Sequence, residues 1–257
     1  MKIIISDPLP SSATELLEKE GWTVDARAGR STDKLSNDIK DAVALIVRSA
    51  TKVTAQLIAS APKLRVIARA GSGVDNVDLQ AASDKGILVL NAPGANSISV
   101  AEHAFALIMS SARSIPRADA QMKNGEWGKK SLRGVELRGK TLGVIGLGRI
   151  GRELAHRARA FDMSVVAHDP FITTNIAEEL GIELLTLAVL AEQADFISLH
   201  LPSTDATRGI VNSDFLSSCK PDAKIINTAR GDLIDEAALS DALTNGQIGG
   251  AGLDVYA

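Results

Sequence analysis

Short apolar runs alternate with amphipathic stretches over roughly the first ninety residues of the chain. The apolar runs predict strands at 2–6, 22–27, 44–50, 64–73 and 87–94. The stretches between them repeat apolar residues with the helical period and predict helices at 11–21, 31–39, 54–62 and 76–86. Strands and helices that alternate in this way predict a parallel sheet covered by helices on both faces.

The pattern changes near residue 96, where one long helical stretch begins. The stretch 96–115 keeps the helical period, carries Ser97 and Glu102 near its start and is followed by Pro116, so we expect a single helix there. The next stretch, 117–137, is polar with scattered glycines, and it predicts a helix that leads into an exposed arm.

A second alternating series starts after Arg138. Apolar runs predict strands at 141–146, 164–169, 182–185, 194–202, 223–230 and 249–257. Helical periodicity predicts helices at 149–161, 177–181 and 235–246. Six strands are the number found in a doubly wound sheet that binds a dinucleotide.

Composition narrows the class of protein without naming a function. Hydrophobic residues make up 45% of the 257 residues and the net charge is −3, which favours neither nucleic acid nor a membrane surface as a partner. The amino-terminal apolar run is too short for a secretion signal. Cys219 is the single cysteine, which excludes an intrachain disulfide and fits a cytoplasmic location. We interpret it as a buried or bystander thiol rather than a nucleophile, and we predict no metal site.

The segment VIGLGRIG carries the most informative motif. Gly146, Gly148 and Gly151 have the G-x-G-x-x-G spacing between a predicted strand and a predicted helix, and this context distinguishes a dinucleotide loop from an ordinary glycine turn. The helix that follows can bind phosphate with its free N–H groups. Asp169 ends the next strand, where a carboxylate accepts ribose hydroxyls and repels a 2′-phosphate, so we expect NAD rather than NADP.

Several motifs together resemble the D-isomer-specific 2-hydroxyacid dehydrogenases. They are GLGRIG, HDP, SLHLP, INTARGDLIDEAAL and GAGLDV, and they occur in order along the second half of the chain. VRSATKVT and RAGSGVDNVDL in the first half resemble the D-3-phosphoglycerate dehydrogenase branch of this family. The resemblance extends over nearly the whole chain and is more specific for the family than for the substrate.

The resemblance implies an α/β protein of two doubly wound parallel-sheet domains with the active site in the cleft between them. Residues 1–92 would be a flavodoxin-like substrate-binding domain without its returning carboxyl-terminal helix, and residues 93–257 a Rossmann NAD-binding domain that ends after its sixth strand. The helix and arm at 97–135 would form a homodimer or a higher homo-oligomer. Trp127 would then contact a neighbouring subunit, although local packing explains this side chain equally well.

Functional residues follow from the resemblance position by position. Arg230 matches the arginine that binds the substrate carboxylate, a role that suits a guanidinium fork. Arg48 and Arg69 end neighbouring strands and would bind the substrate phosphate, with Ser72 and Gly73 beside them; solvated surface arginines are the alternative. The cofactor would contact, besides the glycine loop and Asp169, Arg149, Ile150, His200, Leu201, Pro202, Thr207, Thr228, Ala229 and Asp254.

The family also needs a general base for the hydroxyl proton, a histidine that a glutamate orients. Both lie beyond Ala257 in the family, and none of the histidines of this chain is well placed beside Arg230 to replace them. We interpret His103 as a core or helix-surface residue and His156 as a solvated residue of the helix after the glycine loop. His168 ends a strand beside Asp169, and His200 matches a cofactor position. We therefore expect this chain to bind NAD with little or no turnover.

Three hypotheses follow from the resemblance. The first is NAD-dependent oxidation of a D-2-hydroxy acid, with 3-phosphoglycerate oxidised to 3-phosphohydroxypyruvate as in the first step of serine biosynthesis. The second is a glyoxylate or hydroxypyruvate reductase of the same family. The third is a non-catalytic NAD(H)-sensing binding module.

Overall fold

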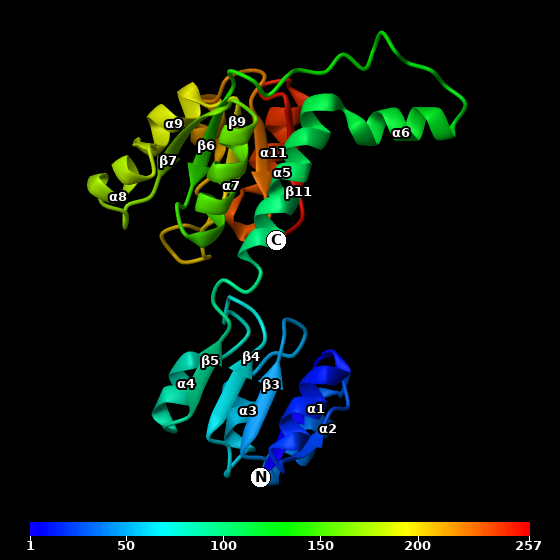
Figure 1. The fold of residues 1–257 in the computed structure, drawn as a ribbon, viewed down its shortest axis with the longest axis vertical. Coiled ribbons are helices and arrows are strands. Elements are labelled where there is room, and N and C mark those ends of the chain that lie inside the picture. The colour runs from blue at the N-terminus through cyan, green and yellow to red at the C-terminus, as the bar shows by residue number, and fades with distance from the viewer. The chain divides into compact units, whose positions relative to one another are not determined.

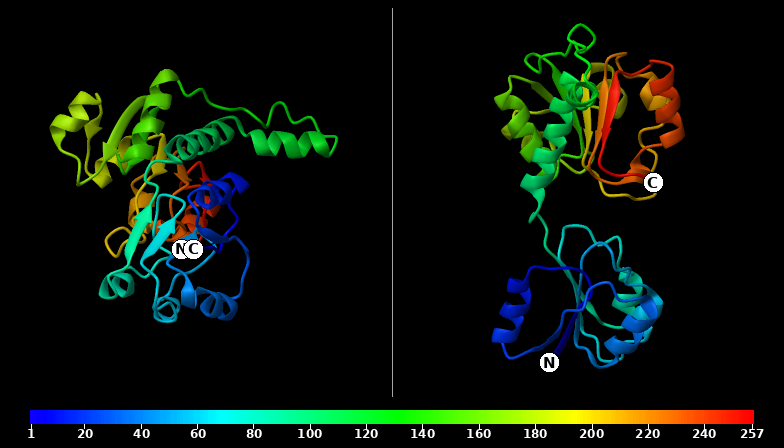
Figure 2. Two further views of the ribbon diagram at one scale, coloured as in Figure 1. Left: turned by 60° about the horizontal axis from the view of Figure 1, so that its bottom comes forward. Right: turned by 90° about the vertical axis from the view of Figure 1, so that its right-hand side faces the viewer.

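The computed structural model describes residues 1–257 and divides into two compact units, Met1–Asn96 and Ser97–Ala257 (Figure 1). The division falls after Asn96 rather than after residue 92, because β5 is followed by a loop that still belongs to the first unit. Each unit is an α/β layered structure with its own parallel sheet (Figure 2).

The first unit contains a five-stranded parallel sheet in the order β2-β1-β3-β4-β5, the flavodoxin-like order. Its strands are β1 (Lys2–Ile5), β2 (Thr23–Asp25), β3 (Ala44–Val47), β4 (Val66–Arg69) and β5 (Leu88–Asn91). Its helices are α1 (Ser11–Lys19), α2 (Thr32–Asp38), α3 (Ala55–Ala59) and α4 (Leu79–Asp84), with a 3-10 turn at Ile39–Asp41. Ile4, Leu45 and Ile67 are fully buried in the central strands and belong to one core with residues of α2, α3 and α4. The expectation of helices on both faces is wrong at β5, where Leu88 and Leu90 are exposed at 56% and 47%.

The second unit contains a six-stranded parallel sheet in the order β11-β10-β9-β6-β7-β8. Its strands are β6 (Thr141–Ile145), β7 (Ser164–His168), β8 (Glu183–Leu184), β9 (Phe196–Leu199), β10 (Lys224–Asn227) and β11 (Gly250–Leu253). Its helices are α5 (Ser97–Arg113), α6 (Ile115–Lys123), α7 (Arg149–Ala160), α8 (Thr174–Glu179), α9 (Leu187–Gln193), α10 (Ser213–Ser217) and α11 (Glu236–Thr244), with a 3-10 turn at Gly231–Leu233. Numbered within the unit, the strand order is that of a Rossmann dinucleotide-binding sheet, which confirms the predicted fold.

The expected helix at 96–115 is wrong at its carboxyl end. Helix α5 ends at Arg113, and Ser114 adopts a left-handed conformation with φ of 51° that turns the chain into α6. Pro116 lies in the first turn of α6, where its missing N–H has no helical partner to lose, so it begins a helix rather than following one. No helix of the structure combines the length and the apolar composition of a membrane span.

Two short helices were not predicted from the sequence. Helix α9 is capped by Thr186, whose hydroxyl accepts from the N–H of Val189, and α10 is capped by Asn212, whose side chain accepts from the N–H of Phe215. The sequence of α9, LAVLAEQ, begins with five consecutive apolar residues, and that of α10, SDFLS, has only two adjacent ones, so neither shows a helical period.

Candidate functional site

The loop between β6 and α7 has the geometry that its three glycines permit. Gly146 has φ of 98°, and a Cβ on it would lie 2.6 Å from the carbonyl oxygen of His200. A Cβ on Gly151 would collide with the carbonyl oxygen of Gly146 and would lie 3.0 Å from Cγ1 of Val144, so helix and strand approach closely only because it is absent. A Cβ on Gly148 would meet nothing within 4 Å. That open space beside bare backbone fits a pyrophosphate.

Helix α7 begins at this loop with Gly148 as its N-cap. Arg149 is exposed and Ile150 packs on the core, and both belong to the first turn, whose backbone N–H groups have no helical acceptor. The N–H of Arg152 bonds to the carbonyl of Gly148 at 3.0 Å and starts the helical ladder. The free N–H groups and the positive end of this twelve-residue helix suit an anion.

Asp169 lies at the end of β7, beside the glycine loop. Its Oδ2 accepts the N–H of Leu147 at 2.8 Å, and its Oδ1 accepts the N–H of Phe171 at 2.9 Å. The two bonds orient the carboxylate and leave one lone pair on each oxygen for further donors. A pair of ribose hydroxyls matches these acceptors, and a 2′-phosphate would be repelled.

The predicted cofactor residues after β9 form a turn held by its own side chains. Nε2 of His200 lies 2.9 Å from the hydroxyl of Ser198, and burial lowers the pKa of His200 to about 4, so this imidazole is neutral at physiological pH. Leu201 is half-buried against the core and Pro202 is exposed. The hydroxyl of Thr207 donates to the carbonyl of Pro202 at 2.7 Å and closes the turn.

Asn227, which the sequence did not single out, builds the turn that carries Arg230. Its fully buried side chain accepts the N–H of Ala229 at 3.0 Å and donates to the carbonyl of Arg230 at 2.8 Å. The guanidinium of Arg230 donates to the carbonyl of Ala229 at 2.7 Å and is half-buried. The hydroxyl of Thr228 is buried within the same turn. A polar residue at the end of an otherwise buried strand was the signal that could have identified Asn227.

Asp254 follows β11 and is paired with a histidine. The N–H of Asp254 bonds to the carbonyl of Asn227 at 2.9 Å and extends the β10–β11 ladder by one residue. Nε2 of His103 on α5 lies 3.2 Å from Oδ1 of Asp254, and both side chains are about half exposed, at 49% and 52%. The interpretation of His103 as a core or helix-surface residue therefore missed its contact with a predicted cofactor residue.

The two arginines of the first unit lie at the carboxyl ends of adjacent strands. Arg69 is the last residue of β4 and pairs in register with Val47, so Arg48 follows β3 at the same edge. The guanidinium of Arg48 is exposed, with Nη1 3.4 Å from the carbonyl of Pro8. The guanidinium of Arg69 lies over Gly71, on which a Cβ would displace it. These positions fit the prediction of an anion site without testing it.

Ser72 and Gly73 belong to the loop after β4. The hydroxyl of Ser72 lies 2.6 Å from Oδ1 of Asn96, and its carbonyl accepts from the side chain of Asn91 at 2.6 Å. Gly73 is half-buried in the same loop. The two asparagines thus fix this loop, and the sequence analysis had not selected either of them.

Asp7 positions the segment that carries Arg48 and was also missed. This carboxylate is 4% exposed at the end of β1. Its Oδ2 accepts the N–H of Arg48 at 2.6 Å and the N–H of Thr51 at 3.2 Å, while Oδ1 accepts the hydroxyl of Thr51 at 2.5 Å. The side chain of Asn76 donates to the carbonyls of Arg48 and Thr51, both at 2.7 Å. The loop is therefore clamped by side chains from two other elements.

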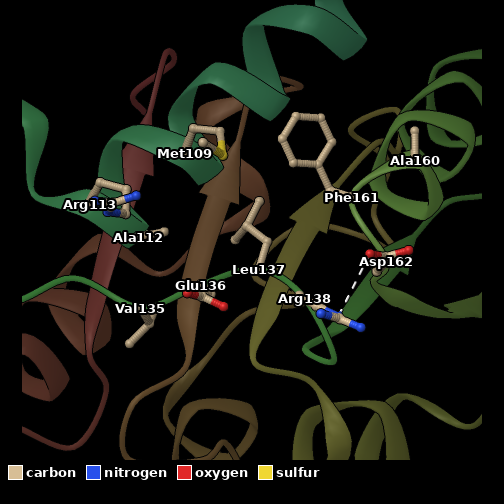
Figure 3. A pocket seen from close by; sticks show the side chains of 10 residues that line it. All are labelled: Met109, Ala112, Arg113, Val135, Glu136, Leu137, Arg138, Ala160, Phe161 and Asp162. Carbon is tan, nitrogen blue, oxygen red and sulfur yellow. Dashed lines mark ion pairs between the residues drawn. The ribbon is translucent and has the colours of Figure 1, made fainter.

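A pocket of about 360 Å³ opens in the second unit near the start of β6, at the opposite end of this strand from the glycine loop (Figure 3). It lies between the end of α5, the end of α7 and the segment before β6, with Met109, Leu137 and Phe161 among its apolar residues. Arg138 and Asp162 face one another across its rim at 3.9 Å. None of the predicted site residues lines this pocket.

Comparison with known proteins places these motifs in context. A family model described as D-isomer specific 2-hydroxyacid dehydrogenase, NAD binding domain, matches residues 105–257. The chain is 50% identical over its whole length to D-3-phosphoglycerate dehydrogenase of Methanocaldococcus jannaschii, of which it covers 49%. The chain spans about half the length of the curated relatives it matches.

Solved structures of similar fold also match the chain over its whole length. The TT0316 protein from Thermus thermophilus is 36% identical with a TM-score of 0.92, and the match covers 100% of this chain and 82% of that one. A D-lactate dehydrogenase from Aquifex aeolicus complexed with NAD and lactic acid is 32% identical with a TM-score of 0.88, covering 100% of this chain and 77% of that one.

Proposed function

The chain belongs to the D-isomer specific 2-hydroxyacid dehydrogenases and contains the NAD-binding domain of that family, and on this premise we propose that it serves the NAD-dependent oxidation of a D-2-hydroxy acid. The observation that carries the proposal is the glycine loop with Asp169, whose oxygens are oriented by the N–H groups of Leu147 and Phe171. NAD, when bound, supplies the hydride acceptor.

Arg230 is the residue of this chain that we propose to bind the substrate carboxylate. Its backbone is fixed by Asn227, whose side chain accepts the N–H of Ala229 and donates to the carbonyl of Arg230 itself. A guanidinium held in this way can pair with a carboxylate through two parallel N–H bonds and can polarise a neighbouring oxygen at the carbon that reacts. We assign the transfer of the hydroxyl proton to no residue of this chain.

We favour 3-phosphoglycerate as the substrate. The D-3-phosphoglycerate dehydrogenase of M. jannaschii is 50% identical to this chain, which supports the phosphorylated acid over its relatives. Arg48 and Arg69, one residue beyond β3 and at the end of β4, supply two positive charges at one sheet edge, which suits a phosphate.

The first test is binding of NADH and NADPH to the 257-residue chain, followed by NADH formation from NAD and 3-phosphoglycerate. The proposal expects NADH binding that Arg230→Lys leaves unchanged and binding of 3-phosphoglycerate that Arg230→Lys weakens, because lysine loses the bidentate geometry. A chain that binds neither nicotinamide nucleotide would overturn the proposal. NADH binding without affinity for any hydroxy acid would favour the NAD(H)-sensing module instead.

The second test separates substrates of the family. Arg48→Ala and Arg69→Ala are compared for affinity toward 3-phosphoglycerate and toward D-glycerate, which lacks the phosphate. Loss confined to the phosphorylated acid supports the assignment. Equal losses for both acids would contradict the phosphate site and favour a non-phosphorylated substrate such as glyoxylate or hydroxypyruvate.

A further inference from the structure

Helix α5 approaches the last strand of the second sheet at a glycine. A Cβ on Gly252 would lie 3.1 Å from Cδ1 of Ile226 and 3.2 Å from Cβ of Leu107, so the helix packs against bare backbone of β11. Leu107 and His103 are four residues apart on α5 and share one face of the helix. The close approach at Gly252 therefore fixes how far His103 stands from the strand.

The register of this contact brings His103 to Asp254. Moving back four residues along α5 covers about 6 Å, and moving forward from Gly252 to Asp254 covers about 6.6 Å of extended chain. Helix and strand run in opposite directions, so the two displacements coincide. The start of α5 and the end of the chain accordingly lie on the same side of the second unit (Figures 1 and 2).

The pair is poorly suited to a purely structural role. Both side chains are about half exposed, and an exposed contact of this kind contributes little to stability. The backbone of Asp254 is held separately, by the bond from its N–H to the carbonyl of Asn227. Contact with His103 therefore leaves the backbone where it is and selects the orientation of the carboxylate.

Other charged groups near His103 are engaged elsewhere. Glu102 pairs with Arg157 of α7 at 3.2 Å, and Arg157 also pairs with Glu153 at 2.7 Å. Nε2 of His103 lies 3.2 Å from Oδ1 of Asp254, on one side of the carboxylate, which leaves Oδ2 able to accept a donor from a ligand.

The location of the pair points to the nicotinamide half of a dinucleotide. Ligands bind outside the carboxyl ends of strands in doubly wound sheets, and each half of the sheet serves one mononucleotide. The glycine loop and Asp169 belong to the β6–β8 half, whereas Asp254 follows β11 in the other half. A carboxylate at that place can accept an N–H from the carboxamide of the nicotinamide.

We propose that His103 is a positioning residue that orients Asp254 toward the carboxamide of bound NAD(H), an inference that rests on the proposed function. Nothing in the sequence motif of either residue indicates the other. The imidazole would act through Asp254 and would not touch the reacting atoms.

The test compares NADH with ADP-ribose, which lacks the nicotinamide. We expect His103→Leu to weaken NADH binding by about 3- to 10-fold, the effect of one hydrogen bond, and to leave ADP-ribose affinity unchanged. His103→Gln, whose amide can still donate, should restore most of the NADH affinity. His156→Leu makes the same substitution at an exposed histidine of α7 and serves as the matched control, with no loss expected.

The double variant His103→Leu with Asp254→Asn completes the experiment. If His103 acts through Asp254, the double variant should bind NADH no more weakly than Asp254→Asn alone. An unchanged NADH affinity in His103→Leu, or equal losses for NADH and ADP-ribose, would overturn this inference alone. A parent chain that does not bind NADH would overturn the proposed function and this inference with it.

Discussion

Replacing Asp7 should release the loop that carries Arg48. In the structure this carboxylate accepts two backbone N–H groups and one hydroxyl, from Arg48 and Thr51, and it is 4% exposed. Asp7→Ala leaves all three donors without their acceptor. At about 1 kcal/mol for each hydrogen bond, we expect the free energy of unfolding of the first unit to fall by about 3 kcal/mol.

Asp7→Asn should cost much less, about 1 kcal/mol, because its amide oxygen can still accept the two N–H groups. Its amide nitrogen would donate to the hydroxyl of Thr51, which can turn round to accept. Only the charge assistance would then be lost. A larger loss of free energy of unfolding in Asp7→Ala than in Asp7→Asn therefore tests the hydrogen-bond geometry rather than burial alone.

The two tryptophans of the chain allow the first unit to be followed by itself. Trp22 belongs to the first unit and Trp127 to the second, where it is 80% exposed. In a Trp127→Phe background, urea unfolding monitored by tryptophan fluorescence reports the surroundings of Trp22. Asp41→Ala, which removes an exposed carboxylate of the same unit that pairs with Lys2, is the control and should leave the unfolding midpoint close to that of the parent.

Binding measurements complete this prediction. Asp7→Ala should weaken binding of 3-phosphoglycerate, because Arg48 is no longer held, and should leave NADH affinity unchanged, because the glycine loop belongs to the other unit. An Asp7→Ala chain as stable as the parent, or an Asp7→Asn chain as unstable as Asp7→Ala, would refute the reasoning.

Two further predictions concern charge. The hydrogen bond from Arg27 lowers the pKa of Asp25 from 3.8 to about 2, against the opposing effect of burial. The ionised carboxylate therefore stabilises the fold by about 1–2 kcal/mol once solvent screening is allowed for, fully above pH 3.8 and less and less as the pH falls toward 2. The free energies of unfolding of Asp25→Asn and the parent, measured in urea, should differ at pH 7 and converge near pH 2, and a difference that stays constant would contradict the assignment. Asp169→Asn removes the charge that repels a 2′-phosphate, so the ratio of NADPH affinity to NADH affinity should rise by about tenfold. Titration of the variant with both nucleotides measures this ratio, and an unchanged ratio would disprove the prediction.

Much of the fold was readable from the sequence because it depends on local patterns. Short apolar runs located all eleven strands, the helical period located most helices, and β-α alternation implied parallel sheets. The errors arose where local signals were short or ambiguous. The apolar residues of α9 and α10 are consecutive and show no helical period, and Pro116 is compatible with either the end of one helix or the start of the next.

The residues of the candidate site were likewise predictable only where their contacts are local in the sequence. The glycine loop and Asp169 were predictable because their spacing, and the hydrogen bond that joins Asp169 to Leu147 of the loop, lie within one β-α-β unit of continuous sequence. Asp7 was not, because its partners lie on the loop after β3, and a carboxylate near the start of a chain looks like a surface residue. Asn227 gave a weak signal as a polar residue that ends a buried strand.

The contact of His103 was the least predictable from the sequence. Its contact with Asp254 depends on the separation between α5 and β11, and that separation depends on the missing side chain of Gly252. Adding that side chain therefore makes a prediction about the pair: Gly252→Ala should push α5 away, lengthen the contact and mimic the effect of His103→Leu on NADH binding. If Gly252→Ala lowers NADH affinity further when His103 has already been replaced by leucine, the glycine acts on the cofactor by another route, and helix spacing does not explain the position of the histidine.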